Sequence, residues 1–251
     1  MIIIVKSKDQ TALMREAAKV TGYILKELED LIEPGISTMD VNDFCEKEIF
    51  AHGMIPTFKG YGGFPATACV SLNEEIAQGI PDRSRIIREG DIVTVDLGAT
   101  FRGYASDAAR TYGAGSISDD AAHLIKAAED SFFAGLEFCR AGKRVSDISH
   151  AVQVKAESEG FGVVREFTGH GIGRELHEDP QIPNHGRPGR GPRIAAGMVF
   201  AIEPMITRGS CDVKILQNGM TAVTADGKLS AHYENTVVIT DDEPEIITLF
   251  E

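Results

Sequence analysis

The chain has 251 residues, with 38 Asp and Glu against 25 Lys and Arg, so its formal net charge is −13. The 43% of apolar residues is ordinary for a folded protein and excludes an intrinsically disordered chain. The acidic excess argues against nucleic acid as the main partner, because phosphate binding requires a basic surface. We expect one domain over residues 1–251, with internal halves of roughly 1–115 and 116–251.

Two helices are predicted in the first fifty residues. Ser7 and Gln10 match a capping box, and apolar residues then recur at three- and four-residue steps up to Leu31. A second helix is predicted at residues 39–52, with Gly53 as its C-cap. After a glycine-rich loop, strands are predicted at 66–72, at the β-branched run 91–97 and at 104–112. We expect the last two strands to form a hairpin.

The second half repeats the order of helix, helix and strands. Helices are predicted at 119–140 and 146–159, followed by strands at 163–167, 198–206, 212–216 and 232–240. The segment 184–197, rich in Gly, Pro and Arg, is expected to be a long irregular loop. A shift of 107 residues places Asp40 on Asp147 and Asp96 on Glu203. We therefore predict an α+β fold in which two helix pairs cover one face of a curved, mainly antiparallel sheet.

The cysteines and the N-terminal segment bear on the compartment. The chain has no Cys-x-x-Cys pair, only four apolar residues follow Met1, and no apolar stretch approaches the roughly 20 residues of a membrane span. We expect buried free thiols, no membrane contact and a cytoplasmic protein. The four cysteines are Cys45, Cys69, Cys139 and Cys211.

Four carboxylates and one imidazole stand beside apolar or glycine-rich runs. Taken singly, each carboxylate could face solvent or pair with an arginine, and the histidine could be a simple turn residue. Together they are the donor set of a site for two divalent ions, and such a site predicts a hydrolase. The five residues are Asp96, Asp107, His170, Glu203 and Glu234.

The motifs around these five residues resemble those of the type I methionine aminopeptidases, of the pita-bread fold shared with aminopeptidase P and creatinase. The motifs are Val-Asp-Leu-Gly, Ser-Asp-Ala-Ala-Arg-Thr, Gly-His-Gly-Ile-Gly-Arg, Ile-Glu-Pro-Met and Tyr-Glu-Asn-Thr, in chain order. The resemblance covers about residues 3–240. It implies removal of the N-terminal methionine from nascent proteins and peptides by a metal-activated bridging hydroxide.

The resemblance also implies a role for each ligand. Asp96 would bind one metal ion, and Asp107 and Glu234 would bridge both. His170 and Glu203 would complete the coordination of the second ion. Both ions would be Mn, Fe, Co or Zn. The free amine of the substrate would bind near the ion at Asp96.

Further residues match the catalytic groups and pocket of that family. Glu203 would carry a proton from the attacking water to the leaving amine, and His177 would polarise the scissile carbonyl. Read without the family, His177 could be a surface loop histidine and the pocket residues could be ordinary core. The pocket for the first side chain would be lined by Tyr61, Phe64, Cys69 and Leu176. Asn73 and Ser230 match positions that can hold a structural monovalent cation.

The chain departs from the family pattern at three positions. Gln78 replaces a histidine that lies beside the scissile amide, and glutamine cannot transfer a proton near pH 7. This change predicts slower turnover or altered specificity, and it does not affect the metal ligands. Leu176 and Met220 stand where aromatic residues are common, so we expect a looser pocket and a broader choice of first residue.

Three alternatives stay open at this point. An Xaa-Pro aminopeptidase-like hydrolase shares the fold, although such enzymes usually carry a further N-terminal domain. A catalytically weak or silent pita-bread module that binds peptides or proteins is suggested only by Gln78. The loop arginines Arg187, Arg190 and Arg193 could bind nucleic acid, but on an acidic chain they favour a solvated loop or contact with a partner such as the ribosome. We expect a monomer that acts on peptide and nascent-chain N-termini beginning with Met.

Overall fold

An antiparallel sheet forms the centre of the computed structural model, which describes residues 2–250. The strands lie in the order β10-β9-β11-β16-β7-β4-β2, and β17 pairs with β16. Every pairing within this sheet of the described chain is antiparallel. The strands are β2 (Ala68–Leu72), β4 (Ile92–Leu97), β7 (Ala108–Gly113), β9 (Thr168–Gly171), β10 (Glu178–Pro183), β11 (Val199–Ile202), β16 (Glu234–Val238) and β17 (Glu245–Ile246).

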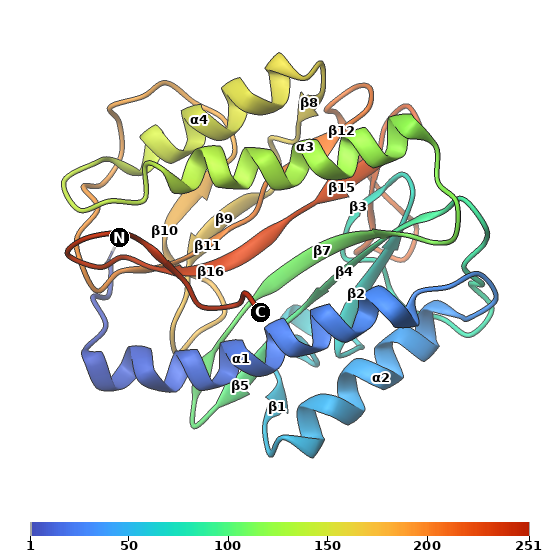
Figure 1. The fold of residues 1–251 in the computed structure, drawn as a ribbon, viewed down its shortest axis with the longest axis horizontal. Helices are drawn as coiled ribbons and strands as arrows, with labels where there is room; N and C mark the ends of the chain where they lie inside the picture. Colours follow the sequence, from blue (N-terminus) through green and yellow to red (C-terminus); the bar gives the residue numbers. More distant parts are fainter. Residues whose placement is uncertain (1, 251) are drawn as a thin grey trace.

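Two helix pairs pack against this sheet. In the view of Figure 1, α1 and α2 lie below the central strands, and α3 and α4 lie above them. The four helices are α1 (Lys8–Leu31), α2 (Thr38–Ala51), α3 (Asp119–Leu136) and α4 (Val145–Ser158). At the start of α1, Ser7 and Gln10 form the predicted capping box. The predicted α+β architecture, with two helix pairs on one face of an antiparallel sheet, is confirmed.

The alternation of side chains along β4 separates the core from the site. Val93, Val95 and Leu97 are fully buried in one cluster with apolar residues of α1 and α2. Successive side chains of a strand point to opposite faces, so Thr94 and Asp96 face away from these helices. The helices therefore cover one face of the sheet, and Asp96 lies on the other.

The repeat of 107 residues is present in the structure. The bounds of α2, moved by 107 positions, coincide with those of α4. A bridge between Ser37 and Ile86 recurs between Arg144 and Arg193. At the start of α2 the backbone N–H of Ser37 donates to Asp40, and at the start of α4 that of Arg144 donates to Asp147. The two halves thus share a backbone hydrogen-bond pattern as well as an order of elements.

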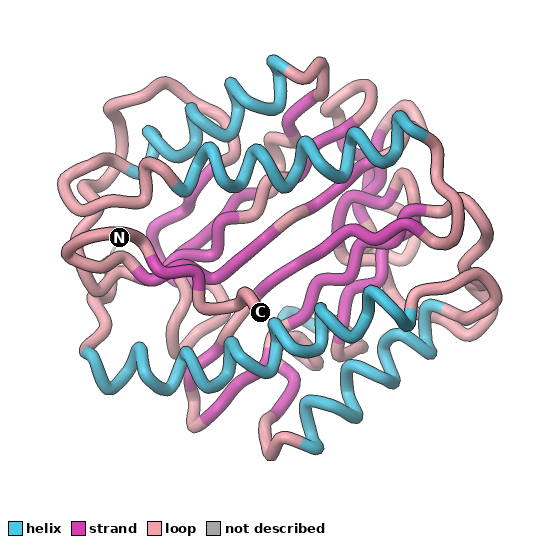
Figure 2. The backbone as a smooth tube through the Cα atoms, in the orientation of Figure 1, coloured by secondary structure: helices cyan, strands magenta, loops and turns pink. Residues whose placement is uncertain are grey.

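Short strands form three small sheets beside the main one, and Figure 2 shows them among the loops. One sheet joins β1 (Ile55–Pro56), β5 (Ala99–Phe101) and β6 (Tyr104–Ala105); the second joins β8 (Gly162–Val163), β12 (Met205–Thr207) and β15 (Ser230–His232); the third joins β3 (Glu75–Ala77), β13 (Val213–Ile215) and β14 (Ala222–Thr224). A single 3-10 turn, η1, spans Tyr61–Gly63.

Three predicted strands are each divided in two. The strand at 104–112 is interrupted at Ser106 and Asp107, the strand at 198–206 at Glu203 and Pro204, and the strand at 232–240 at Tyr233. Pro204 has no N–H to donate to a neighbouring strand, which explains its interruption. At each interruption the chain passes between the main sheet and a small one: into the main sheet at β7 and β16, and out of it after β11.

Other boundaries predicted from the sequence are wrong. Only the first residue of the strand predicted at 163–167 lies in a strand, and β9 begins afterwards at Thr168. The third helix ends at Leu136 rather than at residue 140. Strands β1, β3, β5, β10, β14 and β17 were not predicted, because all but β10 have only two or three residues and β10 contains two prolines.

The cysteines of the described chain are all free thiols. Cys45, Cys69 and Cys139 are buried as predicted, whereas Cys211 is partly exposed. None of the helices within residues 2–250 has the length and apolar character needed to cross a membrane.

Candidate metal centre

The five predicted ligands form a row across five neighbouring strands. His170 lies in β9, Glu203 directly follows β11, Glu234 begins β16, Asp107 directly precedes β7, and Asp96 lies in β4. The row lies on the sheet face that the helices leave uncovered, as the alternation along β4 requires.

Strand register fixes the spacing within this row. Ala109 of β7 is paired with Asp96 on β4 and with Glu234 on β16, the two strands that flank β7. All three side chains therefore point to the same face of the sheet. Asp107 stands two residues before Ala109 and belongs to that face as well. Because Ala109 carries only a methyl group, the two carboxylates face a space that no larger side chain of β7 fills.

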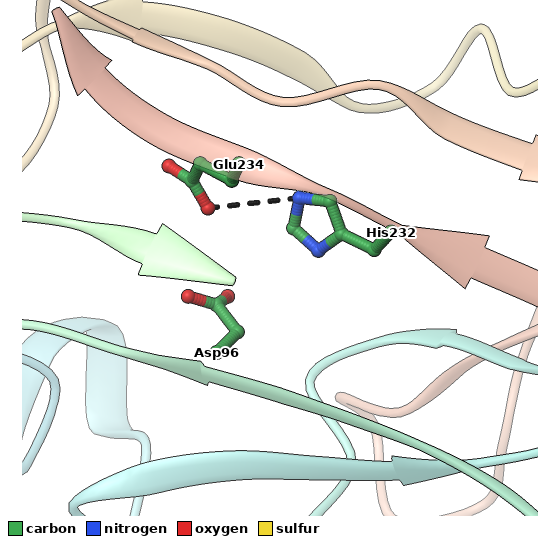
Figure 3. A group of neighbouring side chains, drawn as sticks. All are labelled: Asp96, His232 and Glu234. Carbon is green, nitrogen blue, oxygen red and sulfur yellow. Dashed lines mark ion pairs between the residues drawn. The ribbon is translucent and has the colours of Figure 1, made fainter. Parts of the chain in front are cut away.

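Two groups of potential metal ligands share one residue. Asp107, His170 and Glu234 bring one ligand atom each to within 4.8 Å of one another, and Asp96, His232 and Glu234 do the same. Figure 3 shows the second group, with its two carboxylates and imidazole facing a common space. Glu234 belongs to both groups, which is the arrangement expected of a carboxylate that bridges two ions.

His170 is oriented by its own strand. Its Nδ1 lies 2.9 Å from the carbonyl oxygen of Gly171, so this nitrogen carries the proton and donates it. The lone pair of Nε2 is therefore free, and Nε2 lies 3.5 Å from Asp107 Oδ2 and 3.5 Å from Glu203 Oε1. A carbonyl that fixes the outer nitrogen is the usual partner of a metal-binding histidine.

The glycines around His170 serve the packing of the sheet. A Cβ at Gly169 would stand 2.5 Å from the carbonyl oxygen of Ala201, and one at Gly171 would stand 2.2 Å from that of Asp179. The alternative that His170 is a simple turn residue is wrong. His170 lies in a strand, and the glycines allow the neighbouring strands to approach.

Buried polar atoms without partners mark this row as a cation site. Within the described residues, Asp96 Oδ1, Asp107 Oδ1 and Glu234 Oε1 are buried and have no hydrogen-bond partner. No Lys or Arg side chain in residues 2–250 forms an ion pair with any of the four carboxylates. Because buried polar atoms are normally paired, these oxygens fit divalent ions better than a protein partner.

The electrostatics of the row point the same way. Burial raises the pKa of Asp107 to about 8, and burial together with the neighbouring Asp107 raises the pKa values of Asp96, Glu203 and Glu234 well above normal. Burial lowers the pKa of His170 to about 4, which keeps its imidazole neutral. Burial and mutual repulsion therefore disfavour the ionised carboxylates, and bound divalent ions would favour the ionised form again.

One cavity of about 370 Å³ opens onto the row and brings the other predicted residues together. It is lined by all five predicted ligands, by Gln78 and His177, and by the predicted pocket residues Tyr61, Phe64, Cys69, Leu176 and Met220. Phe64, Cys69 and Leu176 are buried, whereas Tyr61 and His177 are exposed at its entrance.

The backbone of Gln78 and the ring of His177 are each held by a local contact. Gln78 has a positive φ of 55°, and its carbonyl oxygen accepts a hydrogen bond of 2.9 Å from Thr221 Oγ1. The ring of His177 lies 4.3 Å from that of His170, centroid to centroid, in an edge-on arrangement. Partial burial and the nearby His170 lower the pKa of His177, so its imidazole is neutral at pH 7.

Several residues at the site were not predicted. His232 lies beside Glu234, and its position two residues earlier, where alternation returns a strand to the same face, is a signal that could have identified it. Phe58, Phe167 and Met205 line the cavity, which His232 does not, but nothing in their sequence context distinguishes them from core residues.

Two other predicted features lie outside the cavity lining. The N–H of Ser230 donates to the carbonyl oxygen of Asn73 at 2.9 Å, so these residues are neighbours, and the monovalent cation stays a prediction. Arg187, Arg190 and Arg193 are exposed on a loop that is tied to the start of α4.

Comparison with known proteins places this site in a known class. Residues 12–241 match the model of metallopeptidase family M24. The chain is 52% identical over 250 residues to a methionine aminopeptidase of Clostridium acetobutylicum, with all of both chains covered. A crystal structure of methionine aminopeptidase from Thermotoga maritima superposes with a TM-score of 0.98 at 40% identity, covering 99% of this chain and 100% of that chain.

A more distant structure shows that the fold extends beyond these relatives. The Xaa-Pro dipeptidase from Bacillus anthracis has a TM-score of 0.80 at 23% identity, and the match covers 98% of this chain and 62% of that chain. At that identity the likeness concerns the fold alone, the pita-bread fold. The family match over most of the chain and the high identity over its full length show that the chain belongs to metallopeptidase family M24, among the methionine aminopeptidases.

Proposed function

We propose that this chain removes the N-terminal methionine from peptides and nascent proteins by metal-dependent hydrolysis. The observation that carries the proposal is a single one. Five side chains of metal-binding type, with buried oxygens that lack partners, line the same cavity as an apolar pocket suited to a first residue.

Two divalent ions of the Mn, Fe, Co or Zn type would be held by the row of ligands. Asp96 would bind one ion, Asp107 and Glu234 would bridge both, and His170 and Glu203 would complete the second. When bound, such ions lower the pKa of water to near neutral and polarise a carbonyl oxygen. Their four charges would also balance the four carboxylates, whose burial is otherwise costly.

Glu203 is suited to carry the proton. Burial, Asp107 and Asp96 all raise the pKa of Glu203, so the carboxyl group accepts a proton more readily than an exposed glutamate. Its backbone carbonyl accepts a hydrogen bond of 2.9 Å from Asn184 Nδ2, which holds the residue in place. Glu203 would take a proton from the attacking water and give it to the leaving amine.

His177 and Gln78 would contact the scissile peptide group. A neutral His177 can donate a hydrogen bond to the carbonyl oxygen, where negative charge develops during the attack. Gln78 can donate or accept a hydrogen bond beside the amide but cannot transfer a proton. The enzyme is therefore active but slower than one with an acid–base group at this position.

The pocket explains the choice of methionine. Its wall combines the aromatic rings of Tyr61 and Phe64, the thiol of Cys69 and the aliphatic side chains of Leu176 and Met220. A flexible, polarizable thioether packs well against such a wall. The free amine of the substrate would lie at the Asp96 side of the row, which restricts cleavage to the first residue.

Peptides that differ only in their first residue test this function. The purified chain is loaded separately with Mn, Co, Fe and Zn, and the released amino acid is identified. We expect release of Met in preference to other residues with at least one metal. If no metal supports release of any residue, the chain is instead a silent member of its family that binds peptides.

A further inference from the structure

His232 is a buried imidazole beside the metal centre to which no role has been given. It is the last residue of β15, is 2% exposed, and its Nε2 has no hydrogen-bond partner among the described residues. This nitrogen lies 3.6 Å from Oε2 of Glu234, which is also 2% exposed. A buried imidazole nitrogen without a protein partner is unusual, and a bound ion or water would satisfy it.

The internal repeat relates His232 to one of the predicted ligands. Ile92 of β4 lies opposite Gly113 of β7, and Val199 of β11 lies opposite Val238 of β16. The 107-residue shift places Ile92 on Val199, so their strand partners, Gly113 and Val238, are equivalent positions in the two halves. Asp107 lies six residues before Gly113, and His232 lies six residues before Val238. His232 thus occupies, in the second half, the position that Asp107 occupies in the first.

The two ligand groups each contain one imidazole. Asp96 and Asp107 belong to separate ligand groups, and Glu234 belongs to both. In the group with Asp107 the imidazole is His170, and in the group with Asp96 it is His232. Figure 3 shows the imidazole of His232 on the same side as the carboxylates of Asp96 and Glu234.

We propose that His232 binds the same metal ion as Asp96, so that each of the two ions is held by one imidazole. This inference rests on the proposed function, in which Asp96 and Glu234 hold a metal ion. An imidazole at this position changes an all-oxygen ion site, which suits Mg or Ca, into a mixed site that suits Mn, Fe, Co or Zn. Its selectivity therefore shifts toward transition metals.

Cobalt(II) loading of the full chain provides the test. In the NMR spectrum of the cobalt-loaded protein, each coordinated imidazole contributes one strongly shifted, solvent-exchangeable N–H signal. We expect two such signals from the unmodified chain, loss of one in His170→Gln and loss of the other in His232→Gln. The count in the unmodified chain needs no variant, so it holds even if a variant fails to fold.

Calorimetric titration with Co(II) and Mg(II) gives a second readout. We expect His232→Gln to weaken one cobalt-binding event by roughly 10–100-fold, the loss typical of disturbing a metal site, and to leave magnesium binding unchanged. The matched control is His123→Gln, which removes an exposed imidazole on α3 and should leave both cobalt events unchanged.

The outcomes separate this inference from the proposed function. A single imidazole signal in a chain that binds two cobalt ions and releases Met would overturn the role of His232 and leave the function intact. Unchanged cobalt affinity in His232→Gln would also overturn it. A chain that binds no cobalt and releases no Met would refute both proposals.

Discussion

The Nδ1 atom of His177 lies 2.8 Å from the hydroxyl oxygen of Tyr61 at the entrance of the cavity, and the two rings are 5.2 Å apart between centroids. A neutral imidazole has one N–H. If Tyr61 donates its O–H to Nδ1, the proton of His177 is on Nε2, from which it can reach a substrate carbonyl. The contact thus joins a wall of the pocket to a proposed catalytic group.

Replacing Tyr61 by Phe should lower kcat for a Met-peptide. The hydrogen bond to His177 is lost while the ring remains, and a net value of about 0.5–1.5 kcal/mol corresponds to a loss of about twofold to twelvefold. The measurement is the initial rate with saturating peptide. In a double-mutant cycle, Tyr61→Phe should cost nothing further once His177 is replaced by Ala, and full additivity would contradict the contact.

Replacing Gln78 by His should raise kcat/KM for Met-peptides. A positioned acid–base group typically contributes roughly 10²–10⁴-fold, and the gain will be smaller if Gln78 already supplies a useful hydrogen bond. The positive φ at this position is tolerated by histidine, so the backbone should not oppose the change. Gln78→Asn, which adds no titratable group, serves as the control. An unchanged or lower kcat/KM for the histidine variant would show that the position takes no part in proton transfer.

Replacing Met220 by Tyr should narrow the pocket and sharpen the preference for methionine. Met220 lines the cavity, with its Cε 3.6 Å from where a Cβ on Gly63 would stand, and an aromatic ring there would fill space open to other first residues. The ratio of kcat/KM for Met over Leu as first residue should rise. The rise should not exceed the roughly 10–200-fold discrimination that an apolar pocket achieves for one methylene group. Met220→Leu keeps the volume and should leave the ratio unchanged. A ratio that falls in Met220→Tyr would place the first side chain elsewhere.

The metal-free chain should lose stability as the pH rises from 7 to 9. Burial raises the pKa of Asp107 to about 8, so the folded chain binds more protons than the unfolded chain, and the free energy of unfolding falls with rising pH. For each such group the loss is at most about 1.4 kcal/mol per pH unit. His170, with a pKa lowered to about 4, contributes little in this window because its imidazole is neutral in the folded chain and mostly neutral in the unfolded chain.

Thermal unfolding of the chelator-treated chain measures this effect. We expect a lower Tm at pH 9 than at pH 7, a smaller difference in Asp107→Asn, and little difference after Mn(II) is added. An equal or higher Tm at pH 9 in the metal-free chain would mean that these carboxylates are already ionised at neutral pH.

Much of the architecture could be predicted because local patterns and packing agree. The apolar steps of α1 face the sheet, and the shift of 107 residues recovers the positions of α2 and α4. The five ligand motifs could be located because charged residues within apolar runs are rare. The pocket residues could be named only through the family resemblance, since an aromatic or thiol side chain has the same local signature in a core.

The strand boundaries could not be predicted where chemistry interrupts regular structure. Asp107 and Glu203 lie in the gaps between two strands, and an apolar run gives no sign that the chain leaves one sheet there for another. β9 was missed because its glycines are atypical of strands, and they are tolerated only because neighbouring backbones approach closely. His232 was not predicted, although its spacing of two residues from Glu234 is a signal that could have identified it.

The most direct test compares the unmodified chain with Asp96→Asn for metal content and Met release in the same samples. Asp96→Asn keeps the shape of the side chain and removes one charge from the row. We expect the unmodified chain to bind two divalent ions and to release free Met from a Met-peptide. We expect Asp96→Asn to lose one ion and to release no Met. Undiminished Met release by Asp96→Asn, or release by the chelator-treated chain, would contradict these expectations.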